Sequence, residues 1–343
     1  MIARRISFVI TATYILAFAF VAGCGGEADS ELTSLDVLLD WKPQMEQAGF
    51  IVADAKGFYR KQGLKVSFHE GQGATTTAAL VGSGRYNLGI SRGGATIIAR
   101  SKGVPVVSIA LLNQRSPTVI FALESSGIVS PSDLIGKRIG LTQTGVKFDE
   151  YRALMGKLGI DRSQITEVNV KKSVAPLLSG SLDAMLGYTE DQPVRVELQG
   201  KKVVRIPMSR YGVNVLSTNI VSNETFIESS PEICRKFVLA TLKGWKRAIE
   251  HPEEAVMIYL ARYPESREDF VRENFRQFVP LLFSADTDSG GLGTQTVEGF
   301  RETEVLLHHL GIIDTCVGAH TALTNRFLPG IHARKPEPPP RLR

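Results

Sequence analysis

The chain has 343 residues, with 40 lysines and arginines against 35 aspartates and glutamates and a formal net charge of +5. Two arginines precede the apolar N-terminal run, and the Pro-rich stretch 334–343 holds four basic residues and one acid, so the body of the chain is close to neutral. This balance excludes a strongly basic groove, and no nucleic-acid partner is expected. The length is sufficient for two domains of ordinary size.

The N-terminus has the pattern of a secretory signal. Arg4 and Arg5 precede an apolar run, and small residues lead directly to Cys24. This order of basic, apolar and small residues is typical of a signal peptide, and the run is short for a membrane span of about 20 residues. The segment around Cys24 resembles the lipobox of bacterial lipoproteins. We therefore expect a signal peptide over 1–23, a lipid on Cys24 and a flexible tether over 24–34, with a weak membrane anchor as the alternative.

Beyond the tether, short β-rich runs alternate with amphipathic helical patterns, which is typical of open sheets with helices on both faces. Strands are expected over 35–39, 65–69, 87–90 and 104–112, and helices over 50–62, 75–81 and 95–101. The alternation restarts after residue 126, with strands over 138–141, 165–170 and 184–187 and helices over 147–158 and 174–178. A strand over 215–222 and helices over 231–250, 252–263, 267–279 and 294–310 follow.

The restart of the pattern predicts an α/β fold of two lobes, with the second inserted into the first. Lobe 1 is expected over 35–122 and 216–330, lobe 2 over 123–215, and a disordered tail over 331–343. The chain would cross between the lobes twice, and two crossings make a hinge. In such sheets ligands bind in the crevice outside the carboxyl ends of the strands.

Several motifs resemble one family of transport proteins. They are Asp40-Trp41-Lys42-Pro43, Gly57-Phe58-Tyr59, Gly63-Leu64-Lys65-Val66, Asp133-Leu134-Ile135-Gly136-Lys137 and Gly187-Tyr188. From about residue 35 to 330 the chain resembles the ABC-importer solute-binding proteins for thiamine-pyrimidine precursors, which have riboflavin, sulfonate and nitrate binders as relatives. The resemblance implies a periplasmic-binding-protein type 2 fold, an extracytoplasmic location, and a monomer that works with permease and ATPase subunits.

The chain departs from the pyrimidine binders at two places. Gln44 and Gln47 stand where those proteins often carry Asn and His. Gln192 replaces the glutamate of an Asn-Glu-Pro motif that can pair with an aminopyrimidine. The family also contains a pyrimidine-synthesising enzyme that consumes its histidine and carries a cysteine-rich loop. Since Gln47 stands at the histidine position and 140–145 holds no cysteine, we expect no enzymatic activity.

Three strand–helix turns supply the ligand contacts expected in lobe 1. The residues are Asp40, Trp41, Gln44, Gln47, Gly73, Ala74, Thr75, Ser91 and Arg92. The Trp41 ring either stacks on a planar ligand or belongs to the core. The glycine-rich turn either offers backbone N–H groups to the ligand or only shapes a loop. Arg92 either clamps an anion or forms a salt bridge within the protein.

In lobe 2 and at the first crossing, further polar residues follow predicted strands. The expected contacts are Gln114, Thr142, Thr144, Tyr188, Glu190 and Gln192, with Arg115 and Ser116 beside the crossing. Tyr188 either stacks opposite Trp41 or packs within the lobe. The six histidines stand at no spacing that suits a catalytic triad or a metal, so neither a metal nor a cofactor is expected. Cys234 and Cys316 either pair in an oxidising compartment or remain separate thiols.

The prediction is thus a solute-binding protein for a small planar N-heterocycle. Two alternatives remain. One is a binder of a sulfonate or other small anion, in which Arg92 or Arg115 is the clamp. The other is a pyrimidine-synthesising enzyme on the same fold.

Overall fold

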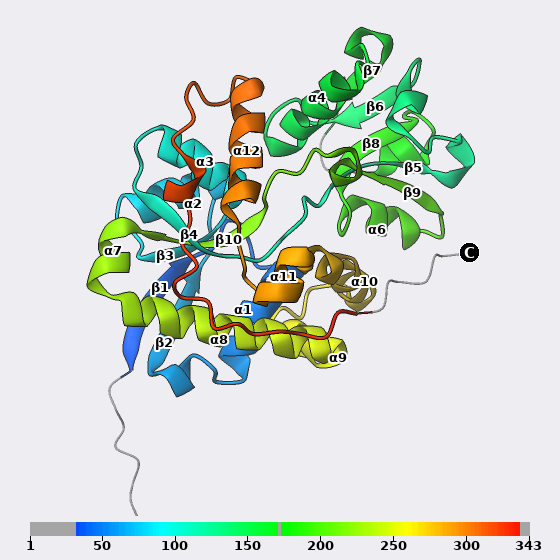
Figure 1. Cartoon of the computed structure of the whole chain (residues 1–343). Coiled ribbons are helices and arrows are strands. Elements are labelled where there is room, and N and C mark those ends of the chain that lie inside the picture. The colour runs from blue at the N-terminus through cyan, green and yellow to red at the C-terminus, as the bar shows by residue number, and fades with distance from the viewer. Residues whose placement is uncertain (1–31, 171–172, 337–343) are drawn as a thin grey trace, which may run out of the picture. The chain divides into compact units, whose positions relative to one another are not determined.

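The computed structural model describes residues 32–170 and 173–336 (Figure 1). The predicted signal peptide, Cys24 and nearly all of the predicted tether therefore lie outside the described residues. Within the described part of the chain, no helix combines the length and the apolar character needed to cross a membrane.

The first sheet consists of β1 (Thr33–Leu38), β2 (Leu64–His69), β3 (Leu88–Arg92), β4 (Val106–Leu111) and β10 (Thr218–Asn223). Its strand order is β2-β1-β3-β10-β4. β1 pairs in parallel with β2 and β3, whereas β10 is antiparallel to both β3 and β4. Every residue of β4 and β10 is buried, and β4 is an almost continuous apolar run, as is typical of a strand covered on both faces. β10 instead buries four polar residues, which are Thr218, Asn219, Ser222 and Asn223.

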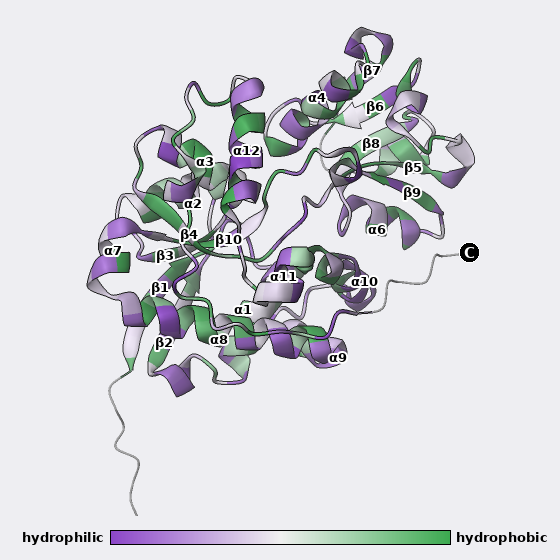
Figure 2. Ribbon diagram, in the orientation of Figure 1, coloured by the Kyte–Doolittle hydropathy of each residue, from purple (hydrophilic) through white to green (hydrophobic). Residues whose placement is uncertain are grey.

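The helix expected over 50–62 ends at residue 55, helices over 224–229 and 285–290 were not expected, and the other helix bounds lie within three residues of the expected ones. Helices lie on and around this sheet. They are α1 (Ala48–Ala55), α2 (Ala74–Gly82), α3 (Gly93–Ser101), α7 (Glu224–Ser229), α8 (Pro231–Glu250), α9 (Pro252–Arg262), α10 (Glu268–Phe278), α11 (Ala285–Gly290) and α12 (Val297–His309). Figure 2 shows hydrophobic residues along the central strands and hydrophilic residues on the surfaces of the helices. The Trp245 ring of α8 is fully buried and stacks on Phe278 at a centroid distance of 5.7 Å.

The second sheet consists of β5 (Thr118–Leu123), β6 (Arg138–Leu141), β7 (Thr166–Asn169), β8 (Ala184–Tyr188) and β9 (Val203–Pro207). Its strand order is β7-β6-β8-β5-β9. The helices of this lobe are α4 (Val146–Leu158), α5 (Ala175–Leu178) and α6 (Gln192–Glu197). Two mixed sheets, each flanked by helices and joined by two crossings, confirm the predicted fold class.

The first crossing comes earlier in the chain than the expected boundary at 122/123. β5 belongs to the second sheet, where it pairs antiparallel with both β8 and β9. The physical reason is its run of six apolar or small residues, which is buried between two neighbouring strands. The crossings therefore lie between β4 and β5, and between β9 and β10.

The part of the C-terminal tail that the structure describes is not detached from the first lobe. The Ile331 carbonyl oxygen accepts a 2.7 Å hydrogen bond from the Leu292 N–H, and the side chains of Ile331 and Ala333 pack against the core. The expectation of disorder from residue 331 was thus wrong for 331–336, because two apolar side chains precede the Pro-rich end.

Candidate ligand-binding site

A cavity of about 200 Å³, here called the inner cavity, is lined by residues of both lobes. Its lining consists of Asp40, Trp41, Gln44, Glu46, Gly73, Ala74, Arg92, Lys147, Tyr188, Glu190, Asp191, Gln192 and Asn274. Asp40, Arg92 and Tyr188 lie at or just beyond the carboxyl ends of β1, β3 and β8. This is the place where open α/β sheets bind their ligands.

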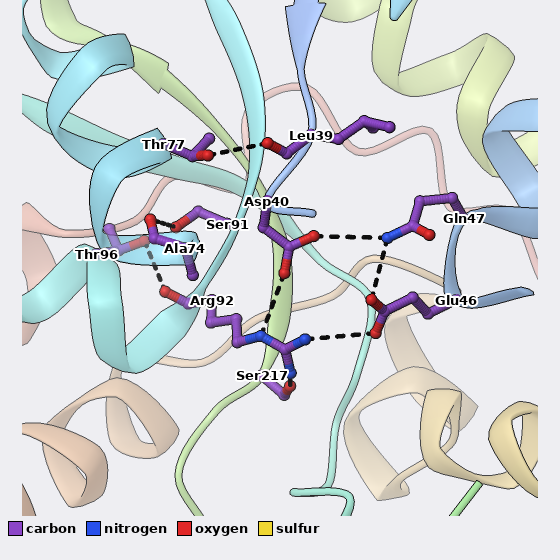
Figure 3. A network of polar contacts seen from close by, with 10 residues as sticks. All are labelled: Leu39, Asp40, Glu46, Gln47, Ala74, Thr77, Ser91, Arg92, Thr96 and Ser217. Atoms are coloured by element: carbon purple, nitrogen blue, oxygen red, sulfur yellow. Dashed lines mark hydrogen bonds and ion pairs between the residues drawn. The ribbon is translucent and has the colours of Figure 1, made fainter. Parts of the chain in front are cut away.

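Arg92 is the centre of a polar network on the lobe 1 side of the inner cavity (Figure 3). Its Nε lies 3.3 Å from Asp40 Oδ2, its Nη2 lies 3.4 Å from Glu46 Oε2, and its Nη1 donates to Ser217 Oγ at 2.9 Å. Burial opposes the charge on Arg92, but Tyr188 and the two carboxylates raise its pKa above the ordinary value, so the guanidinium stays protonated. The protein's own acids therefore already compensate this cation.

The glycine-rich turn is fastened to the end of β1. Gly73 N–H donates to the Asp40 carbonyl oxygen at 2.7 Å, and Thr77 Oγ1 donates to the Leu39 carbonyl oxygen at 2.9 Å. Gly71 is required here because a Cβ would overlap the Leu39 carbonyl oxygen, and Gly73 has φ +121°. Since the Gly73 N–H is used within the protein, the turn shapes the wall of the inner cavity and leaves that donor unavailable to a ligand.

Two buried carboxyl groups face this cavity from opposite lobes. Burial and the neighbouring Glu46 raise the pKa of Asp40 to about 7, although Arg92 acts in the other direction. Burial raises the pKa of Glu190 to about 8. Glu190 Oε2 is buried and has no hydrogen-bond partner among the described residues. A buried polar atom without a partner costs about 1–3 kcal/mol, so a ligand that satisfies it is favoured.

The Tyr188 ring is held by cations of both lobes. The Arg92 guanidinium carbon lies 5.5 Å and Lys147 Nζ lies 4.4 Å from the ring centroid. Burial raises the pKa of Tyr188 to about 12, so its phenol is neutral at physiological pH. The Tyr188 N–H donates to Gln192 Oε1 at 2.8 Å, and Gln192 thereby fixes the backbone at the end of β8.

Trp41 is 40% exposed and lines the inner cavity, which excludes the core position considered from the sequence. Of the other sequence-predicted residues, the structure also brings Asp40, Gln44, Gly73, Ala74, Arg92, Tyr188, Glu190 and Gln192 to this cavity. Whether Trp41 and Tyr188 hold a ring between them stays a prediction.

The remaining sequence-predicted residues do not line the inner cavity. They are Gln47, Thr75, Ser91, Gln114, Arg115, Ser116, Thr142 and Thr144. Gln114 is a structural residue, because its Nε2 donates to the carbonyl oxygens of Leu111 and Thr294. Thr142 Oγ1 donates to the Val170 carbonyl oxygen, and Arg115 lines a different cavity of about 990 Å³ beside α4 and α12.

Sequence reasoning missed four residues of the inner cavity, which are Glu46, Lys147, Asp191 and Asn274. Glu46 stands in the same turn as Asp40, and Asp191 lies between two predicted contacts, so local spacing contained a signal for both. Asn274 comes from α10, and its Nδ2 donates to the Glu190 carbonyl oxygen at 2.7 Å, 84 residues away in the sequence. No local pattern indicates that contact.

The described residues contain no group of three or more His, Cys, Asp or Glu side chains that could hold a metal ion. Cys234 is buried and Cys316 is exposed, and both thiols are free. Of the two options left open by the sequence, the structure therefore shows separate thiols.

Comparison with known proteins assigns this chain to a family. A model of the NMT1/THI5-like family matches residues 44–255, which is more than half of the chain. The chain belongs to the NMT1/THI5-like family. A riboflavin-binding protein of Chloroflexus aurantiacus is 26% identical to this family member over 92% of the chain and 91% of the relative. A formylaminopyrimidine-binding protein of Halalkalibacterium halodurans is 28% identical over 84% of the chain and 89% of the relative.

Solved structures agree with the fold of this NMT1/THI5-like chain. The periplasmic aliphatic sulphonate-binding protein of Escherichia coli superimposes with a TM-score of 0.68 at 14% identity, covering 84% of the chain and 97% of that protein. At this identity the likeness establishes the periplasmic-binding-protein fold and leaves the ligand open.

The expectation that the chain has no enzymatic activity is contradicted by relatives that are named as synthases. The family contains a 4-amino-5-hydroxymethyl-2-methylpyrimidine phosphate synthase of Legionella pneumophila, which is 29% identical over 85% of this chain and 92% of its own length. Synthases of the same name in Saccharomyces cerevisiae are 28% identical over 72% of the chain. Membership of the NMT1/THI5-like family therefore covers both binding proteins and synthases.

Proposed function

We propose that this chain is the extracytoplasmic solute-binding subunit of an ABC importer and captures a small planar N-heterocycle in the inner cavity. The observation that carries the proposal is the buried Glu190 carboxyl, whose Oε2 has no partner among the described residues and which lines a cavity next to an aromatic ring. The binding proteins for riboflavin and formylaminopyrimidine in the same family support a heterocyclic ligand.

The chemistry of Glu190 suits an amino-substituted ring. An exocyclic amino group donates a hydrogen bond, and the neighbouring ring nitrogen accepts one. A carboxyl group with a pKa of about 8 is mostly protonated at neutral pH, so it offers one O–H donor and one acceptor oxygen. Two parallel hydrogen bonds to such a ring would satisfy the unpartnered oxygen and orient the ligand, and the aromatic faces of Trp41 and Tyr188 would cover the ring.

The size of the inner cavity favours a single ring. Drug-sized ligands occupy pockets of roughly 300–1,000 Å³, whereas this cavity measures about 200 Å³. A substituted pyrimidine suits that volume better than a tricyclic flavin.

The charges argue against an anionic ligand. Among the ionisable groups that line the inner cavity, Asp191 is paired with Arg195 at 2.6 Å, and Glu190, with a pKa of about 8, is mostly protonated at neutral pH. Arg92, the expected anion clamp, is already bound to Asp40 and Glu46. A sulfonate would therefore have to displace one of these two carboxyl groups to reach Arg92.

Export and membrane attachment complete the proposal. The N-terminal pattern of Arg4, Arg5, an apolar run and Cys24 supports a secreted, lipid-anchored chain. A chain attached on the extracytoplasmic side could deliver its ligand to a permease and its ATPase. The two crossings between the sheets would serve as the hinge on which the lobes close over the ligand.

The proposal is tested by isothermal titration calorimetry of the purified full chain. The panel contains 4-amino-5-hydroxymethyl-2-methylpyrimidine, the same ring without its amino group, riboflavin, an alkanesulfonate and nitrate. We expect the aminopyrimidine to bind and the ring without the amino group to bind at least about 10-fold more weakly, which corresponds to about 1.4 kcal/mol. Binding of the anions alone would overturn the proposal.

A further inference from the structure

A second and larger cavity, here called the outer cavity, adjoins the inner one. Its volume is about 900 Å³, and it is bounded by the loop 41–45, α6, α9 and α10. Trp41, Gln44, Asp191 and Asn274 line both cavities. A ligand held in the inner cavity would therefore have space beyond Trp41 for a further part of its structure.

Aromatic side chains form much of the wall of the outer cavity. Tyr259 and Tyr263 lie with ring centroids 4.9 Å apart, and the Tyr259 hydroxyl donates to the Pro43 carbonyl oxygen at 3.2 Å. The Phe270 ring lies under the Arg195 guanidinium at 4.2 Å from its centroid. With Trp41, these rings line the same space, and Arg195 already lies over one of the Phe270 faces. Such faces bind flat groups by stacking.

The charges of the outer cavity disfavour an anion. Arg195 is paired with Asp191 at 2.6 Å, and Arg267 is paired with Asp269 at 2.5 Å. The other lining charges are one cation, Lys42, and two acids, Glu70 and Glu265. The lining as a whole holds three cations and three acids, so it has no net positive charge to attract an anion. Because aromatic faces attract cations, a neutral or cationic group is favoured.

We propose that the outer cavity is a second subsite, which binds a neutral or cationic ring attached to the heterocycle held in the inner cavity. This inference rests on the proposed function, because the inner cavity must hold the first ring. It extends that function, since the ligand would be a two-part molecule whose ends occupy different cavities. A space that merely separates the lobes before closure would show no preference for such a ligand.

The test compares three probes by calorimetry on the full chain. The first is 4-amino-5-hydroxymethyl-2-methylpyrimidine. The second is thiamine, in which a closely similar pyrimidine carries a cationic thiazolium ring, and the third is thiamine monophosphate, whose extension is anionic. We expect thiamine to bind at least about 10-fold more tightly than the pyrimidine, and the monophosphate to lose most of that advantage.

Variants in the wall of the outer cavity test whether the tighter binding of thiamine arises there. Phe270→Ala and Tyr263→Ala should remove the advantage of thiamine and leave the Kd of the pyrimidine unchanged. Met257→Ala, an exposed position on α9 that does not line the cavity, is the matched control and should change neither Kd.

The outcomes separate the two proposals. If the pyrimidine binds and thiamine binds equally or more weakly, the subsite is overturned and the proposed function stands. If the Phe270→Ala and Tyr263→Ala variants keep the full advantage of thiamine, the subsite is likewise overturned. If the pyrimidine itself does not bind, the proposed function fails and the subsite fails with it.

Discussion

The buried carboxyl group of Glu190 affects both the stability of the protein and the proposed binding of its ligand. Its carboxyl group is buried without a partner for Oε2 among the described residues, which destabilises the unliganded protein, and the residue lines the inner cavity. The energetic cost and the proposed binding contribution therefore reside in one side chain.

We predict that Glu190→Leu weakens binding of the aminopyrimidine by about 10- to 100-fold, because it removes two hydrogen bonds of a neutral carboxyl group, each worth about 0.5–1.5 kcal/mol. The same change should raise the free energy of unfolding of the unliganded protein, since it removes an unsatisfied buried carboxyl. Calorimetric titration and urea unfolding measure the two effects. Glu124→Leu, at an exposed acid of the same lobe, is the control and should change neither. Undiminished binding by Glu190→Leu would contradict the role given to this residue.

At the scale of elements, Glu150 joins helix α4 to both crossings between the sheets. Its carboxylate accepts hydrogen bonds from the Thr118 hydroxyl and from the Val215 N–H, the latter at 3.2 Å. Burial raises the pKa of Glu150 from 4.5 to about 7, although these hydrogen bonds act in the opposite direction. The folded protein therefore keeps this carboxyl protonated at a pH where the unfolded chain ionises it.

The sign of the resulting pH dependence follows from that difference. Below about pH 4.5 the carboxyl is protonated in both states and the shift has no effect on stability. Between about pH 4.5 and 7 only the unfolded chain ionises, so up to about 3 kcal/mol of stability is lost as the pH rises. Glu150→Gln cannot ionise and should be more stable than the parent at pH 8 and similar at pH 4.5. Urea unfolding at both pH values checks this, and equal effects at the two would refute it.

The contact between α1 and α8 depends on two glycines. A Cβ at Gly244 of α8 would overlap the Gly49 carbonyl oxygen, and a Cβ at Gly49 would overlap the Trp245 ring. We predict that Gly244→Ala destabilises the protein by about 1–3 kcal/mol, because the two helices must move apart. Gly156→Ala on α4 is the matched control, since a Cβ there meets no atom within 4 Å, and it should stabilise by about 0.5–1 kcal/mol. Thermal unfolding of both variants decides the point, and equal shifts would contradict it.

The helices and strands that the sequence predicted are those with an uninterrupted pattern of apolar residues. α8 extends over Pro231–Glu250, as expected, and a proline begins it. β6 extends over Arg138–Leu141, as expected, and buries Ile139 and Leu141. β5 lies before the lobe boundary expected at 122/123 but belongs to the second sheet. β9 was not predicted, because this edge strand has only one fully buried residue and its apolar pattern is weak. In the site, residues next to strand ends were predictable. Asn274 was not, because only the packing of α10 brings it to Glu190.

On the scale of the whole molecule, α12 connects the two lobes. It packs beside α3 of lobe 1, and its Leu306, together with Leu310 just after its end, contacts the core of lobe 2. The chain also passes between the sheets twice. We therefore expect the lobes to unfold in one transition.

This cooperativity is measurable because Trp41 and Trp245 both belong to lobe 1. Tryptophan fluorescence and a dye attached in lobe 2 should report coincident urea transitions. Ligand at about 100 times its Kd should shift both by about 2.7 kcal/mol. Two separate transitions, or a shift confined to one probe, would show that the lobes are independent.

The insertion of one lobe into the other has a consequence for the order of assembly. β4 is an edge strand of the first sheet that pairs with β10, and the register joins Leu111 to Asn219. Its other side forms isolated bridges to Leu323 and Gly293, which follow still later in the chain. During synthesis of the chain, β4 therefore lacks its partner strand until more than a hundred further residues have been added. Closing a loop of that length costs about 4 kcal/mol in chain entropy, and such non-local pairing is slow. Prior folding of the inserted segment would shorten the effective loop, so we expect β4 and β10 to join last and to set the refolding rate.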